Sequence, residues 1–109
     1  MSLYLARAAY NSEGFKGMVS NPQDRAAAVK GLATGLGIEI KHIYFSPALG
    51  EIYMIMESTP EKNARLSMVV FSSGTFTDGS IIDLMTTEDM TAAMKDAGTL
   101  LGTYTPANA

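Results

Sequence analysis

The sequence predicts an α+β fold in which helices cover one face of a four-stranded antiparallel sheet. The order of the predicted elements is strand, helix, strand, strand, helix, strand, helix. A capping side chain followed by proline marks the start of two helical regions, and apolar residues recur at helical spacing after each. The strands carry bulky apolar residues on both faces, which a sheet with one face in water does not need.

The first strand is expected over residues 3–10, LYLARAAY, where successive side chains point to opposite faces. A short helical segment, SEGFKGMVS, follows with Asn11 or Ser12 as its cap. A second helix is expected to start at Asn21-Pro22, with Asn21 as the cap and Pro22 at the first position. Because proline lacks the N–H donor of an uninterrupted helix, the helical region is predicted to be broken there.

A hairpin is expected next, formed by residues 38–45, IEIKHIYF, and residues 51–58, EIYMIMES. Thr59-Pro60 repeats the cap-plus-proline pattern and opens a helix that runs through Phe71. The apolar residues expected on one side of this helix are Ala64, Met68 and Phe71.

The last strand is expected over about residues 76–85, with a bulge at Gly79. Thr86 then caps a final helix. Its apolar stripe consists of Met90, Ala93, Met94, Ala97 and Leu101. This element order is the ferredoxin-like βαββαβ arrangement with one helix added at the C-terminus. We expect a single domain over residues 1–101 and a flexible tail over residues 102–109.

The side-chain pattern of the strands predicts that a second protein surface packs on the sheet. In EIYMIMES, Ile52 and Met54 point to one face while Tyr53 and Ile55 point to the other, so both faces carry bulky side chains. Charged residues make up only 17% of the chain, against roughly 25% in a typical soluble domain. If the helices bury one face, a second copy of the sheet is expected to bury the other. The sequence thus predicts a homodimer or a higher homo-oligomer.

Composition narrows the classes of function. The net charge is −3, and the eight basic residues are scattered rather than clustered as nucleic-acid binders require. No apolar run approaches the roughly 20 residues that span a bilayer. With no cysteine and a single histidine, neither thiolate chemistry nor a metal site is expected. We therefore expect a cytoplasmic protein without a cofactor, a metal, or a nucleic-acid or membrane partner.

Five polar side chains on the predicted strands are candidates for a ligand site. His42 is the only histidine, and Tyr44, two residues later, shares its strand face. Tyr53 and Glu57 share a face of the next strand, and Arg7 is a charge among apolar neighbours on the first strand. We predict that these residues line one pocket. The alternative is structural, with the rings packed in the core or an interface and the charges at the rim or in an ion pair.

Three stretches resemble the GYD-domain family: YNSEGFKGMVSNPQDRAAAVKGLATGLG, LGEIY and LMTTEDMTAAMKDAG. The likeness covers about residues 3–98. Proteins of this family are small ferredoxin-like domains of the dimeric α+β barrel type, so the resemblance implies that fold and a paired sheet. Where the family usually shows Gly-x-Tyr-Asp, this chain has Gly50, Glu51, Ile52 and Tyr53.

Three classes of function fit these observations. The preferred one is an oligomeric binding or regulatory module that holds a small, largely apolar molecule between sheet and helices. The second, implied by fold analogy alone, is a cofactor-independent isomerase or monooxygenase of the dimeric-barrel kind. In that enzyme His42 or Glu57 would act as the base, and Tyr44 or Tyr53 would orient the substrate. The third is a structural or protein-interaction module whose interface is itself the function.

Overall fold

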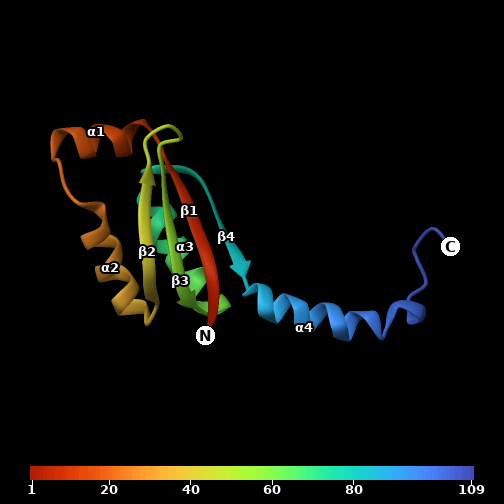
Figure 1. The fold of residues 1–109 in the computed structure, drawn as a ribbon. Helices are drawn as coiled ribbons and strands as arrows, with labels where there is room; N and C mark the ends of the chain where they lie inside the picture. Colours follow the sequence, from red (N-terminus) through yellow and green to blue (C-terminus); the bar gives the residue numbers. More distant parts are fainter.

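The computed structural model describes residues 1–109 and contains four strands, four α-helices and a short 3-10 helix (Figure 1). The elements are β1 (Ser2–Tyr10), α1 (Ser12–Ser20), α2 (Arg25–Leu36), β2 (Glu39–Ser46), β3 (Glu51–Ser58), α3 (Pro60–Ser72), β4 (Phe76–Leu84), α4 (Thr87–Gly98) and η1 (Leu101–Thr103). The strands form one antiparallel sheet in the order β2-β3-β1-β4. The predicted α+β, ferredoxin-like fold with an added C-terminal helix is therefore confirmed.

The sheet has an inner face that packs on α2 and α3 and an outer face that no helix covers (Figure 1). The core lies at the inner face, where Ala33 of α2, Met54 and Met56 of β3 and Leu66 of α3 are buried together with Ile38. Because strand side chains alternate, every second residue of each strand is left on the outer face. Only one face of the sheet is therefore buried within the chain.

The predicted break near Pro22 is confirmed, but the second helix is capped by a different residue. Asn21 closes α1, since its N–H donates to the carbonyl oxygen of Gly17 at 2.9 Å. The residue that caps α2 is Asp24, whose carboxylate accepts from the Ala26 N–H at 3.0 Å. Because Asn21 is used in ending the first helix, it is not available to begin the second, and Pro22 lies in the link between them.

Helix α3 begins as predicted, with Thr59 as its cap and Pro60 in the first turn. Its buried side differs from the expected one. Leu66 is buried, whereas Met68 is 71% exposed and Phe71 is 41% exposed. Residues two apart on a helix lie about 200° from each other, so a helix that buries Leu66 turns Met68 outward.

The expected bulge at Gly79 is wrong. Gly79 pairs regularly with Ala8, and the irregularity between β1 and β4 falls between Ala9 and Tyr10. Glycine is needed at position 79 for another reason: a Cβ there would overlap the ring of Phe71 and lie 2.9 Å from the carbonyl oxygen of Arg7. The missing side chain thus lets α3 approach the sheet closely.

Helix α4 extends away from the rest of the chain (Figure 1). Thr86 caps it as predicted, accepting from the Asp89 N–H at 3.0 Å. Every residue of α4 is exposed, including Met90 and Met94 of its apolar stripe. The radius of gyration is 18.1 Å, whereas a compact chain of this length has about 13 Å. None of the helices combines the length and the apolar character needed to cross a membrane.

Candidate ligand site between the sheet and its helices

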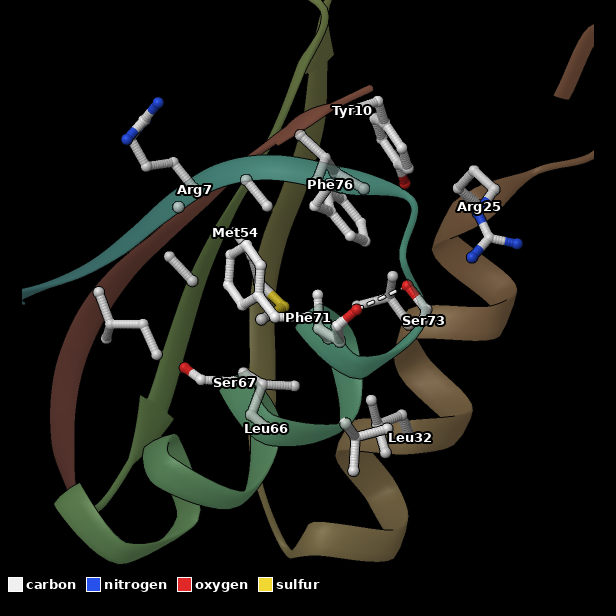
Figure 2. Close-up of a pocket in the computed structure, with 18 of the residues that line it drawn as sticks. Arg7, Tyr10, Arg25, Leu32, Met54, Leu66, Ser67, Phe71, Ser73 and Phe76 are labelled. Carbon is white, nitrogen blue, oxygen red and sulfur yellow. Dashed lines mark hydrogen bonds between the residues drawn. The ribbon is translucent and has the colours of Figure 1, made fainter. Parts of the chain in front are cut away.

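A cavity of about 260 Å³ lies between the inner face of the sheet and the helices α2 and α3 (Figure 2). Of the 21 residues that line it, 15 are hydrophobic, so its wall is mainly apolar. The sheet contributes Met54 and Phe76, α2 contributes Leu32, and α3 contributes Leu66 and Phe71. A concave, mostly apolar hollow with a few polar groups is the usual form of a small-molecule site.

Small residues on the two adjacent strands create this space. Ala6 and Ala8 of β1 point to the inner face, where they pair with Ile81 and Gly79 of β4. Three of these four positions carry at most a methyl side chain, so the strands leave volume beneath the helices that larger side chains would fill. Phe71 of α3 then closes the cavity over Gly79.

One end of the cavity is polar. Tyr10, the last residue of β1, is 8% exposed, and its hydroxyl is fully buried without a hydrogen-bond partner. Arg25, the first residue of α2, also lines the cavity and forms one side-chain hydrogen bond, to Gln23, and no ion pair. Figure 2 shows the Tyr10 hydroxyl directed toward the space between Phe76 and Arg25. Buried hydroxyls usually find a partner, so this one is an exception that calls for an explanation.

Contacts with three aromatic rings hold the Tyr10 side chain in place. Its ring lies 4.4 Å from that of Phe76, 6.0 Å from that of Phe45 and 6.1 Å from that of Phe15, measured between centroids. The Tyr10 backbone N–H donates to the carbonyl oxygen of Gly50 at 3.0 Å. The phenol is thus fixed by ring packing and by its backbone, and its hydroxyl has no hydrogen-bond partner within the chain.

The residues predicted as a ligand site lie on the opposite, outer face of the sheet. The strand register places Tyr44, Tyr53 and Arg7 side by side in one row across β2, β3 and β1. His42 belongs to the next row, and its ring stacks in parallel on Tyr44 at 6.2 Å between centroids. Glu57 is four residues beyond Tyr53 on β3, about 13 Å along the strand, so it does not join this group.

Glu57 instead lies near a different charge. The Lys41 Nζ is 2.9 Å from a carboxylate oxygen of Glu39 and 3.7 Å from one of Glu57. The hydrogen bond to Lys41 lowers the pKa of Glu39, and the same bond raises the pKa of Lys41. The structure therefore supports the ion-pair alternative for Glu57, although its partner is Lys41 and not Arg7.

Arg7 is the centre of a polar network on the outer face. Its Nε donates to Glu51 Oε1 at 2.7 Å, and its other nitrogens donate to Ser80 at 3.3 Å and Asp78 at 3.2 Å. The Tyr53 hydroxyl donates to the same Glu51 oxygen at 3.2 Å. The bond from Arg7 lowers the pKa of Glu51, and burial, aided by the Glu51 charge, raises the pKa of Tyr53. Arg7 thus already has partners for its charge within the chain.

Neither of the two main hollows of this chain includes the outer-face candidates as a group. The sheet–helix cavity includes Arg7 at its edge, and a second hollow beside the α1–α2 link includes Tyr44. His42, Tyr53 and Glu57 line neither of them. No group of three or more His, Cys, Asp or Glu side chains is placed to hold a metal ion. A ligand role for these five outer-face residues stays a prediction.

Comparison with protein families matches residues 4–94 to the GYD domain. The chain belongs to the GYD domain family. Its fold is similar to a solved structure described as the solution structure of the C-terminal domain of the MgtC protein from Mycobacterium tuberculosis. That likeness has a TM-score of 0.53 and 17% sequence identity, and it covers 77% of this chain and 88% of that one, so it bears on the fold alone. The comparison with curated proteins gave no match.

Two features of this GYD domain were not predicted from its sequence, the polar end of the cavity and the acidic partner of Arg7. A signal for the cavity existed in Ala6, Ala8 and Gly79, small residues at inward positions that predict unfilled space. A signal for the network existed in Glu51, which follows the turn glycine and is therefore near the end of β1 in an antiparallel pair. Arg25 had no such signal, because only the placement of α2 brings it to the cavity that Tyr10 lines.

Proposed function

We propose that this GYD domain is a binding or regulatory module that holds a small, largely apolar molecule in the sheet–helix cavity. The observation that carries the proposal is a cavity of about 260 Å³ with a mainly apolar lining. An engineered apolar cavity of ~150 Å³ is large enough to bind benzene. The GYD-domain cavity therefore suits a ligand somewhat larger than a single aromatic ring, such as a ring with a short chain.

A ligand in this position would affect more than the cavity wall. Leu32 of α2, Leu66 of α3 and Met54 of the sheet all line the space, so one molecule would contact three separate elements. An empty apolar cavity lacks the dispersion contacts that its lining atoms would otherwise make. A ligand that supplies them binds only the folded state and stabilises it by mass action. This gives a physical basis for a regulatory role.

We also propose that the module acts as a homodimer in which a second copy covers the outer face. That face carries apolar side chains in the row next to Arg7, including Leu5, Ile55 and Ile82. The apolar stripe of α4 is exposed as well, and the content of charged residues is only 17%. Exposed apolar surface of this extent on a small domain favours association, and one two-fold contact would cover the same surface on both copies.

The binding proposal is tested with 3-phenylpropan-1-ol, a neutral molecule with one ring and a short chain, titrated into the 15N-labelled protein. We expect saturable shifts of the amide signals of Met54, Leu66 and Phe71, all of which line the cavity. Ala28→Phe, which places a ring at the cavity wall, should weaken binding at least tenfold.

Ala27→Phe is the matched control, because Ala27 is the preceding residue of α2, is exposed and does not line the cavity. Ala27→Phe should leave the affinity for 3-phenylpropan-1-ol within about twofold of that of the unaltered protein. Equal weakening by both variants, or saturable shifts that leave out the cavity-lining amides, would rule out the cavity as the binding site.

A further inference from the structure

The polar end of the cavity indicates which chemical class of ligand it recognises. Two groups lie there, the Tyr10 hydroxyl and the Arg25 side chain (Figure 2). One is a proton donor and the other a cation, and no acidic side chain lines the cavity. The cavity is thus apolar over most of its wall and carries a hydroxyl and a cation at one end.

The Tyr10 hydroxyl lacks a partner although it is buried. Its atom is inaccessible to solvent and makes no hydrogen bond within the chain. A phenol carries one O–H donor, and an unmet donor in the interior costs free energy that a bound acceptor would recover. A ligand oxygen at this point would complete the hydrogen bonding that the fold leaves open.

The charge of Arg25 favours a ligand oxygen that is negatively charged. Arg25 forms no ion pair, and its one side-chain partner is the neutral Gln23. The nearest acid in sequence, Asp24, is engaged with the Ala26 N–H in capping the helix. A planar guanidinium matches the two oxygens of a carboxylate.

We propose that the cavity selects a small amphiphilic carboxylate, with its carboxylate at Tyr10 and Arg25 and its apolar body against Met54, Leu66 and Phe71. This inference rests on the proposed binding function of the same cavity and specifies its ligand class. The net charge of −3 makes the chain a poor general binder of anions, so selectivity for an acid would have to come from this local arrangement.

The test compares 3-phenylpropanoate with 3-phenylpropan-1-ol, which has the same apolar body and a neutral head, at pH 7 by amide NMR titration. We expect the acid to bind at least about tenfold more tightly, since charge-assisted hydrogen bonds are roughly twice as strong as neutral ones. Arg25→Gln should weaken acid binding about tenfold and leave alcohol binding within twofold. Tyr10→Phe, which keeps the ring and its packing, should also weaken acid binding.

Arg65→Gln is the matched control, because Arg65 is an exposed arginine of α3 that does not line the cavity. Arg65→Gln should change neither the affinity for the acid nor the affinity for the alcohol. Equal binding of acid and alcohol, or equal effects of Arg25→Gln and Arg65→Gln, would overturn the carboxylate inference while leaving the apolar site in place. Failure of both molecules to bind would instead remove the proposed function itself, and this inference with it.

Discussion

Arg7 and Glu51 form a half-buried ion pair in a sheet face that is otherwise rich in apolar side chains. The side chains of the two residues are 24% and 12% exposed, and their bond is 2.7 Å long. Tyr53 and Asp78 supply further hydrogen bonds, so the charges are compensated on several sides. A pair of this kind contributes little when fully exposed and costs much when one member is removed, because the other charge is left without its partner.

The first prediction concerns the pH dependence of stability. The bond to Arg7 lowers the pKa of Glu51 in the folded state, so as the pH falls below the ordinary glutamate pKa of about 4.3 the unfolded chain takes up the proton first. The stability that Glu51 contributes is therefore complete above that pH and is lost as the pH falls through the lowered folded pKa.

Urea unfolding of Glu51→Gln between pH 7 and pH 3 should show a weaker loss of stability on acidification than the unaltered protein shows. Glu88→Gln, on the exposed helix α4 and without an ion pair, is the control and should follow the unaltered protein. If the Glu51 variant and the unaltered protein lost the same stability between pH 7 and pH 3, the Arg7–Glu51 pair would not lower the pKa of Glu51 on folding.

At the scale of the elements, the packing of α3 on β4 depends on a single glycine. Phe71 of α3 covers Gly79 of β4, and its ring is 5.8 Å from that of Phe76 between centroids. This contact also forms part of the cavity wall. The position of α3 and the shape of the cavity are thus determined by the same close approach.

The second prediction follows from that contact. Gly79→Ala should lower the free energy of unfolding by about 1–3 kcal/mol, because the added methyl group meets the Phe71 ring and the Arg7 carbonyl oxygen. Gly31→Ala in α2, where a Cβ has open space, should raise it by about 0.5–1 kcal/mol. Urea unfolding at pH 7 measures both. A neutral effect of Gly79→Ala would show that Phe71 moves aside without cost.

At the scale of the whole molecule, the outer sheet face and α4 are the surfaces left uncovered. Ile82 on the outer face is 44% exposed, and Met94 on α4 is 58% exposed. The principal extents of 60 × 31 × 25 Å reflect how far α4 extends from the sheet. A helix whose apolar stripe contacts nothing gains little stability from packing, which is what stabilises most helices in proteins.

The third prediction tests the proposed homodimer. Sedimentation equilibrium at micromolar concentration should give about twice the chain mass of 11.6 kDa for the unaltered protein. Ile82→Lys should lower the measured mass toward that of the monomer, because a charge would be buried in the contact between sheets. Met68→Lys is the control, since Met68 is 71% exposed on α3, away from the outer face, and should not change the mass. A monomeric unaltered protein would contradict the proposed assembly.

Local chemistry determined most of the secondary structure. Thr59 with Pro60, and Thr86, are caps whose effect depends on neighbouring backbone groups, and they begin helices where the sequence predicts. Pro22 interrupts the first helical region for the same local reason. The two-sided apolar pattern of β3 likewise follows from alternation along a strand, whatever the rest of the chain does.

Tertiary structure decided which residues meet. Tyr10 and Arg25 are fifteen positions apart and line one cavity only because α2 packs beside β2 and α3, and Arg7 finds Glu51 only through strand pairing. Which side of α3 is buried and where the bulge falls depend equally on the elements that pack there. The cavity itself is a space left between layers, and a space is a property of the arrangement of side chains in three dimensions and not of any one segment.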